Sequence, residues 1–144
     1  MESPIALKIY AVCCIILFLK IFALGMVQGA SRAKNKVFMK PEDAKMAGGV
    51  VSTSDTPMAI TAGNAIKNDL ENIPMFLFLA LVYVMTNCWD RGSLIYFSIF
   101  TFARIMHSVC FLKAIQPWRS IFYGIALLMT FIVSGHILYR IFIR

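Results

Sequence analysis

Four long apolar segments constrain the fold of this chain more than any other feature of its sequence. They cover about residues 6–28, 63–86, 93–115 and 120–142. A bilayer core of roughly 30 Å needs about 20 mainly apolar residues in a helix, and each segment reaches that length. A helix satisfies its own backbone hydrogen bonds inside the hydrocarbon, whereas an open sheet edge does not. We therefore predict an all-α membrane protein with four transmembrane helices.

The composition supports this class. Of the 144 residues, 60% are hydrophobic and 15% are charged, and the mean hydropathy is +0.76, which excludes an ordinary soluble domain. The apolar run of the first segment is too long for a typical secretory signal, so we interpret it as a retained helix. The net charge of +7 does not predict nucleic-acid binding, because the Lys and Arg residues are scattered among apolar segments.

The connections predict the topology. Two of them, NCWDRG and IQPWR, are short enough to make consecutive helices antiparallel, which gives an up-down bundle within one domain, residues 1–144. The connection at about 29–61 is longer and contains turn signals such as GG and SDTP, so we expect a structured loop. Seven of the 14 Lys and Arg residues lie on or near its side, more than near the opposite side, which predicts a cytosolic loop. Fewer cations lie near the opposite side: Lys8, Arg91, Arg140 and Arg144.

The four cysteines predict neither a disulfide nor a metal site. Cys13 and Cys14 are adjacent in the first segment, Cys110 lies within the third, and only Cys88 is near a short connection. None of these spacings matches a zinc motif or a disulfide framework. We expect them to pack as small apolar side chains.

The second segment begins with unusual polarity. Four residues at helical spacing share one face: Asn64, Asn68, Glu71 and Asn72. Polar groups inside a span are costly and normally face a bundle interior, so we expect this face to point inward. Asp69 lies off that face, and we expect it to pair with Lys67 or to cap the start of the helix.

The third and fourth segments carry further polar groups toward the side of the long loop: Arg104, His107, Arg119, Ser120 and Tyr123. A membrane arginine needs a partner, so Asn68 and Glu71 could hold Arg104 in a purely structural role. His107 alone is more often a packing residue, and Lys20 either reaches the interior or the lipid. The convergence of these polar groups from three segments also fits a site for an anionic ligand that carries an amine. An apolar co-substrate could enter such a site from the lipid.

Four sequence blocks resemble the MAPEG family, the membrane-associated proteins in eicosanoid and glutathione metabolism. KNDLENIP resembles the family's RNDxE signature, and RAKNKVFMKPEDAKMAGG resembles its arginine-led KxFANPED loop. ARIMHSV resembles the third-helix motif xRxxHT, and QPWRS resembles the start of the fourth helix. The blocks occur in the family's order and cover the chain from about Arg32 onward. FLFLALVY and RSIFY are most similar to the prostaglandin E synthase branch.

This resemblance implies an assembly and an activity. It implies a homotrimer of four-helix subunits in the membrane of the endoplasmic reticulum or nuclear envelope, with glutathione held between subunits on the cytosolic side. It further implies a glutathione-dependent isomerase or transferase acting on lipophilic substrates. Conversion of prostaglandin H2 to E2 is the most specific version.

The resemblance also implies roles for particular residues. The positions that match glutathione contacts in the family are Arg32, Asn68, Glu71, Arg104, His107 and Tyr123. Glu71 would suit the amine of glutathione. Arg119 would stabilise the thiolate, and Ser120 would donate a hydrogen bond to the sulfur. Asp43 matches a loop acid expected to work beside Arg119.

The chain also departs from the family pattern. Where relatives usually read ERxxRAHxND, this chain reads ITAGNAIKND. Asn64 and Ile66 therefore replace an arginine and a histidine, and Ile60 and Thr61 replace the upstream acid and arginine. Phe111 replaces a tyrosine. Each lost donor costs about 1–3 kcal/mol of binding unless Lys67 or Lys20 compensates. Two alternatives therefore remain: a glutathione transferase or peroxidase with the same site, and a catalytically weakened scaffold.

Overall fold

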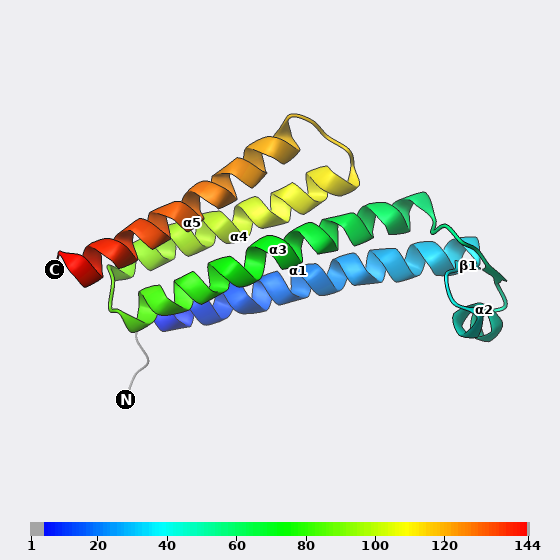
Figure 1. Ribbon diagram of the computed structural model, residues 1–144, viewed down its shortest axis with the longest axis horizontal. Coiled ribbons are helices and arrows are strands. Elements are labelled where there is room, and N and C mark those ends of the chain that lie inside the picture. The colour runs from blue at the N-terminus through cyan, green and yellow to red at the C-terminus, as the bar shows by residue number, and fades with distance from the viewer. Residues whose placement is uncertain (1–4, 144) are drawn as a thin grey trace.

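A computed structural model describes residues 5–143 and shows an elongated bundle of four long antiparallel helices (Figure 1). The helices are α1 (Ile5–Asn35), α3 (Pro57–Met85), α4 (Asp90–Leu112) and α5 (Trp118–Phe142). All four are long and apolar enough to cross a membrane. The predicted all-α bundle with four spans is therefore confirmed. Arg144, one of the charges used to predict topology, lies outside the described residues.

The helix α3 begins at Pro57, earlier than the predicted residue 63, because its first turn is capped. The Thr56 side chain accepts a hydrogen bond from the backbone N–H of Ala59 at 3.4 Å, and Pro57 occupies the first helical position. A threonine cap followed by proline is a strong helix start. The SDTP stretch, which we interpreted as a turn, is this cap.

The helix α1 is also longer than predicted. Its 31 residues span about 46 Å, so about 16 Å of it extends beyond a 30 Å hydrocarbon core. Two contacts tie the extension to the residues before α3. The hydroxyls of Ser31 and Thr56 are 2.7 Å apart, and Nε of Arg32 donates to Oδ2 of Asp55 at 2.9 Å.

The connection between α1 and α3 is the structured loop predicted from its turn signals. It contains, in order, β1 (Val37–Phe38), α2 (Pro41–Ala47) and β2 (Val50–Val51). The two strands pair in parallel. Gly48 ends α2 with a positive φ of 63°, and a Cβ on Gly49 would lie 2.5 Å from the carbonyl oxygen of Lys36. Both glycines are therefore needed for the turn that returns the chain to β1.

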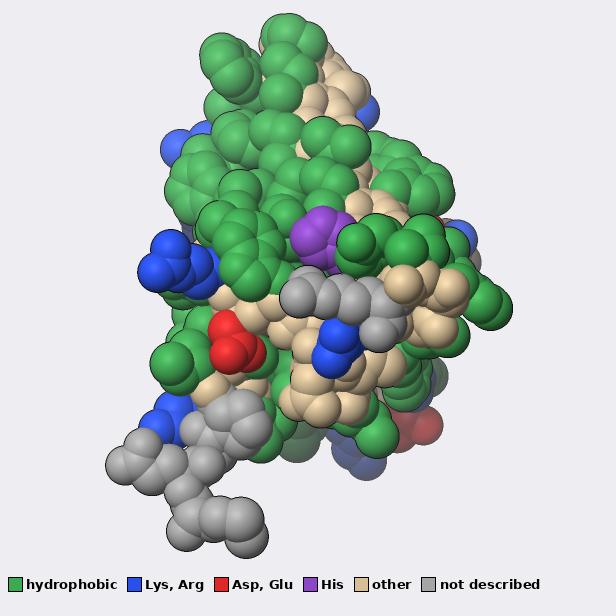
Figure 2. Space-filling view, turned by 90° about the vertical axis from the view of Figure 1, so that its left-hand side faces the viewer, with side chains coloured by type: hydrophobic (Ala, Val, Ile, Leu, Met, Phe, Trp, Pro, Cys, Tyr) green, Lys and Arg blue, Asp and Glu red, His purple; other side chains and the backbone are tan. Residues whose placement is uncertain are grey.

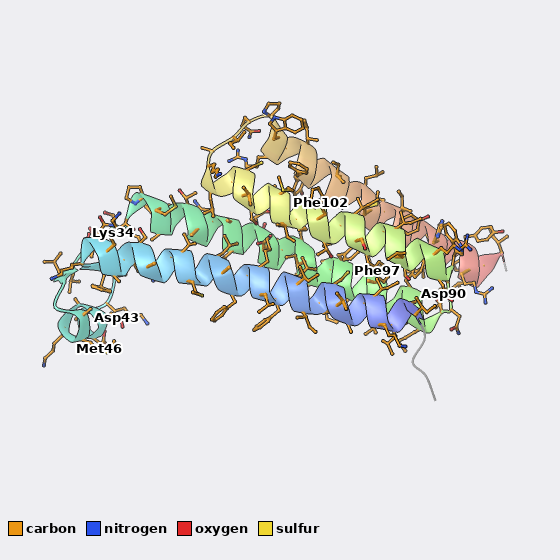
Figure 3. All side chains as sticks on the ribbon, turned by 180° about the vertical axis from the view of Figure 1, so that it is seen from behind. Lys34, Asp43, Met46, Asp90, Phe97 and Phe102 are labelled. Atoms are coloured by element: carbon orange, nitrogen blue, oxygen red, sulfur yellow. The ribbon has the colours of Figure 1, made fainter. Side chains whose placement is uncertain are left out.

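The apolar core lies in the part of the bundle nearer the chain termini. The rings of Phe76 and Phe100 stack with centroids 3.5 Å apart, and Phe97 meets Phe76 edge-on at 5.8 Å. Phe97 is fully buried, whereas Phe102 on the same helix is exposed (Figure 3). The opposite half of the bundle, toward the long loop, contains the polar groups described next.

Candidate functional site

A cavity of about 300 Å³ lies where α3, α4 and the start of α5 meet. Its lining consists of Asn68, His107, Phe111, Arg119, Ser120 and Tyr123. Five of these six are residues that the sequence predicted for the site. The up-down topology explains the grouping, because the end of α4 and the start of α5 adjoin the first half of α3.

The guanidinium of Arg119 is held at the cavity by two neighbours. Its carbon lies 4.9 Å from the centre of the Phe111 ring, a distance typical of a cation–π contact. With the amide of Gln116 oriented to satisfy its neighbours, its oxygen accepts from Nε and Nη2 of Arg119 at 3.1 and 2.7 Å. In that orientation the amide nitrogen donates to Oγ of Ser120 at 3.1 Å. Gln116 therefore connects the two side chains predicted to act on the thiol.

His107 also lines the cavity. It is only 3% exposed, and its ring contacts those of Phe111 and Tyr123 at centroid distances of 5.7 and 6.1 Å. Its Nδ1 is buried and has no hydrogen-bond partner within residues 5–143. A buried polar atom without a partner costs free energy, so a ligand that hydrogen bonds to it would remove that cost.

A buried charge cluster lies beside the cavity and centres on Asp69. This carboxylate is 0% exposed and forms salt bridges with both Lys20 and Arg104. Nη2 of Arg104 also donates to Oδ1 of Asn68 at 2.8 Å, and Ser108 contacts Asp69 at 3.4 Å. Asn68 thus belongs to both the cluster and the cavity. Nε and Nη1 of Arg104 are buried without a partner in the described part of the chain.

This cluster corrects the predicted orientation of the second helix. Asp69 was expected to pair with Lys67 or to cap the helix, but it occupies the centre of the bundle. One alternative was that Asn68 and Glu71 together hold Arg104. Asn68 does accept from Arg104, but the Glu71 side chain is exposed, as are Asn64 and Lys67. The expectation that the polar face of this helix points into the subunit is wrong for Asn64 and Glu71. Lys20, left undecided by the sequence, reaches the interior.

Arg32 and Asp43 lie in another part of the subunit. Arg32 is engaged by Asp55, and the hydrogen bond from its guanidinium lowers the pKa of the Asp55 carboxyl below its ordinary value. Asp43 is exposed on α2, which lies beyond the end of α1 (Figure 3). No hydrogen bond or salt bridge joins Asp43 to Arg119 among the described residues. Within one subunit the predicted site is therefore divided between two places.

Comparison with known proteins decides the family. The model of the MAPEG family matches residues 10–139, nearly the whole chain. This chain belongs to the MAPEG family. The four long helices described above are thus those of a MAPEG subunit, as the sequence blocks predicted.

Several curated MAPEG proteins are similar over most of their length. Prostaglandin E synthase from Equus caballus is 33% identical over 127 residues, which cover 88% of this chain and 83% of the relative. The synthase from Homo sapiens is 32% identical over the same shares. Microsomal glutathione S-transferase 1 from Rattus norvegicus is 32% identical over 127 residues, or 81% of each chain. Because the synthases and the transferase are similar to this chain at nearly the same identity, the comparison does not decide between synthase and transferase activity.

Three of the departures from the MAPEG pattern lie in different surroundings. Phe111 lines the cavity and contacts Arg119, so its missing hydroxyl directly changes the site. Asn64 is exposed, and Ile66 is half-buried outside the cavity lining. Only the change at Phe111 therefore alters the cavity of the single subunit.

Asp69, Lys20 and Gln116 are residues beside the cavity that the sequence analysis did not assign to the site. A signal for Asp69 was present, because it lies four residues after Ala65 and four before Ile73, both buried. An acidic residue within such a buried stripe must find a cation. Gln116 had no comparable signal, since its contacts depend on the turn between α4 and α5.

Proposed function

We propose that this MAPEG protein is a glutathione-dependent membrane isomerase or transferase that acts on lipophilic substrates in the manner of a prostaglandin E synthase. The observation that carries the proposal is the cavity in which Arg119, Ser120 and His107 converge. Its position between membrane-spanning helices allows an apolar substrate to approach from the lipid while a polar thiol binds from the loop side.

The chemistry of the cavity fits glutathione, a thiol peptide with two carboxylates and an amine. The lining offers one guanidinium, one amide and two hydroxyl groups, and it contains no acidic side chain. The unpartnered Nδ1 of His107 provides a further hydrogen-bonding group. Such a set favours an anionic, hydrogen-bonding ligand.

The residues of the chain would act on the thiol through charge and hydrogen bonding. Arg119 would lower the pKa of a nearby thiol, because a cation stabilises the thiolate. Ser120 would donate its hydroxyl hydrogen to the sulfur while its oxygen accepts from Gln116. Bound glutathione would supply the sulfur nucleophile for a peroxide oxygen or an electrophilic carbon. His107 and Asn68 would orient the peptide.

The exposed polar residues of α3 support a homotrimer. Asn64, Lys67 and Glu71 are exposed on a helix long and apolar enough to cross a membrane. Charged groups facing lipid are costly, whereas a facing subunit would provide partners. We propose that neighbouring subunits cover this face and bring Arg32, Asp43 and Glu71 of the assembly to the cavity.

We propose that the loop between α1 and α3 is cytosolic and that the membrane is that of the endoplasmic reticulum or nuclear envelope. Cations are concentrated at this end of the bundle: Arg32, Lys34, Lys36, Lys40, Lys45, Lys113 and Arg119. The positive-inside rule places such an end in the cytosol. The choice of organelle rests on the resemblance to the MAPEG family.

A second candidate function is a scaffold with a weakened glutathione site. The absence of a hydroxyl at Phe111 favours it, because that residue lines the cavity itself. The retained group of Arg119, Ser120 and His107 favours the enzyme. The contact between Arg119 and Gln116 also provides this chain with an interaction that holds the guanidinium in place.

Glutathione-dependent turnover tests the proposal. Purified protein in detergent would be assayed with prostaglandin H2 and with a model electrophile, alongside Arg119→Ala and Lys113→Ala. We expect turnover by the wild type, its loss in Arg119→Ala, and its retention in Lys113→Ala, which removes an exposed cation outside the cavity lining. Turnover of prostaglandin H2 but not of the electrophile would identify an isomerase. Conjugation of the electrophile without turnover of prostaglandin H2 would identify a transferase. Equal turnover by Arg119→Ala would contradict the catalytic assignment.

A further inference from the structure

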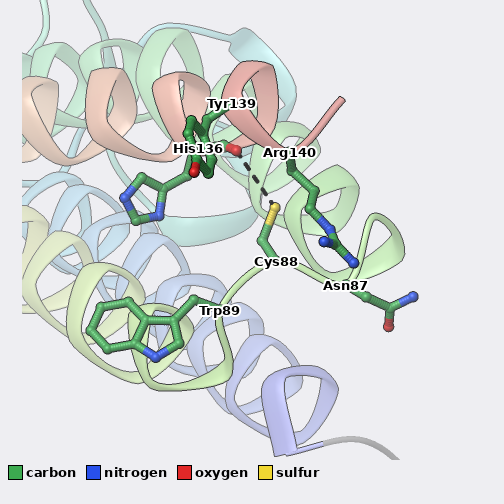
Figure 4. Close-up of a pocket in the computed structure, with 6 residues that line it drawn as sticks. All are labelled: Asn87, Cys88, Trp89, His136, Tyr139 and Arg140. Carbon is green, nitrogen blue, oxygen red and sulfur yellow. Dashed lines mark hydrogen bonds between the residues drawn. The ribbon is translucent and has the colours of Figure 1, made fainter. Parts of the chain in front are cut away.

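A second, larger cavity lies at the opposite end of the bundle. Its volume is about 500 Å³, and its lining comes from the turn between α3 and α4 and from the last turns of α5 (Figure 4): Asn87, Cys88, Trp89, His136, Tyr139 and Arg140. None of these residues belongs to the site described above. The two cavities are separated by most of the length of the bundle, since one lies near the start of α5 and the other near its end.

The guanidinium of Arg140 is oriented by the backbone of the turn. Its Nε donates to the carbonyl oxygen of Thr86 at 3.3 Å, which ties α5 to the end of α3. No acidic side chain lines the cavity, and no acceptor among residues 5–143 engages the two terminal nitrogens of Arg140. Asp90 is next to the lining residue Trp89 in sequence but is not part of the lining.

Several of the remaining lining groups can donate hydrogen bonds: the Asn87 amide, the Trp89 indole N–H and the Tyr139 hydroxyl. The thiol of Cys88 faces the carbonyl oxygen of His136 at 3.8 Å, and Nδ1 of His136 lies 3.4 Å from the hydroxyl of Tyr83. Together with the guanidinium of Arg140, these donors suit a ligand that accepts hydrogen bonds and carries negative charge, such as a phosphate diester.

The cavity also lies at the depth of a membrane interface. Trp89 is 53% exposed and Tyr139 is 52% exposed, at the ends of apolar spans where such aromatic side chains anchor at the headgroups. The surface at this end combines hydrophobic side chains with scattered Lys and Arg side chains, acidic side chains and a histidine (Figure 2). Exposed apolar residues on the adjoining turns, Met85 and Leu138, would contact acyl chains.

We propose that this cavity binds the phosphodiester headgroup of a membrane phospholipid from the leaflet that surrounds the two chain ends. Arg140 contacts the phosphate oxygens, and the donors of Asn87 and Trp89 hydrogen bond to the headgroup. The acyl chains then follow the apolar surface of α5. This site is independent of glutathione binding and of the proposed reaction.

Native mass spectrometry of the detergent-solubilised protein tests the proposal. The probes are palmitoyl-oleoyl phosphatidylglycerol, the diacylglycerol with the same acyl chains, and inorganic phosphate. The variants are Arg140→Gln and, as a matched control, Arg91→Gln, which removes an exposed cation from the same end but outside the cavity. We expect retention of phosphatidylglycerol but not of diacylglycerol by the wild type and by Arg91→Gln. Retention by Arg140→Gln should be about tenfold lower, as expected for a charge-assisted hydrogen bond.

Three results would overturn the proposal. Equal lipid retention by Arg140→Gln and the wild type would exclude the guanidinium, and an equal loss in Arg91→Gln would indicate unspecific charge attraction. If inorganic phosphate displaced the lipid at equal concentration, the site would be one for free phosphate. Arg140→Lys provides a second variant if Arg140→Gln does not fold, because lysine keeps the charge but loses the planar fork, and reduced retention is again expected.

Discussion

Replacing Asp69 by asparagine tests the buried charge cluster most directly, because Asp69 is the acid that pairs with both Lys20 and Arg104. Asp69 and Arg104 are fully buried and the side chain of Lys20 is 8% exposed, so solvent does not screen the cluster. The wild-type cluster has two cations and one anion, for a net charge of +1. Asp69→Asn keeps the shape but raises that net charge to +2, leaving two cations near each other in the bundle.

The size of the effect follows from the loss of one partner in a buried ion pair. Removing one partner typically costs about 3–5 kcal/mol because the remaining charge stays buried. For a protein of this size, each kcal/mol shifts the melting temperature by about 2–4 °C, so a decrease of roughly 6–20 °C is expected. The double variant Lys20→Met/Asp69→Asn returns the net charge to +1 and should recover part of this decrease.

Thermal unfolding of the detergent-solubilised protein, followed by circular dichroism, measures the effect. Glu42→Gln is the matched control, because it neutralises an exposed acid on α2 outside the bundle, and its melting temperature should change little. A melting temperature of Asp69→Asn equal to that of the wild type would refute the buried cluster. A double variant that melts below Asp69→Asn would refute the charge argument.

Three further predictions concern the loop, the cavity and the assembly. The pKa of Asp55 is lowered in the native state by its pair with Arg32. The pair therefore stabilises the loop fully above about pH 4, the ordinary pKa of an aspartate carboxyl. This stabilisation is lost as the pH falls through the lower native pKa. The protection factors for hydrogen exchange across residues 31–57, which correct for the intrinsic pH dependence of exchange, should therefore fall on acidification in the wild type but not in Asp55→Asn. Gln116→Ala should raise the pKa of bound glutathione thiol, measured by ultraviolet titration, with little change in glutathione affinity; an unchanged thiol pKa would contradict its positioning role. Lys67→Cys should form intersubunit cross-links with a short bismaleimide in excess of the wild-type background, and their absence would argue against a covered α3 face.

The four spans could be predicted because apolar length alone decides them. Residues 29–35 and 57–61 were assigned to the loop, since they are less apolar and contain turn-forming residues. Their helical state depends on contacts between them, including those of Ser31 with Thr56 and Arg32 with Asp55. Such contacts form only in the folded subunit, so sequence pattern alone did not reveal them.

Only part of the candidate site could be predicted, because the rest depends on contacts that form in the folded subunit. His107, Arg119 and Ser120 lie close to the turn between α4 and α5, so their proximity follows from topology. The partner of Arg104 depends on the rotation of α3 about its axis, and that rotation selects Asp69 over Glu71. Counting polar residues on one face favoured the wrong acid, because the count does not distinguish an exposed polar face from one that meets the bundle interior.

Binding of glutathione to the purified protein tests the central claim most directly. Calorimetric titration would be combined with ultraviolet detection of the thiolate, in the wild type and in Arg119→Ala. The account predicts binding of millimolar affinity or better, with a thiolate signal near neutral pH that Arg119→Ala loses. An absence of binding at tens of millimolar glutathione would contradict it and favour the scaffold.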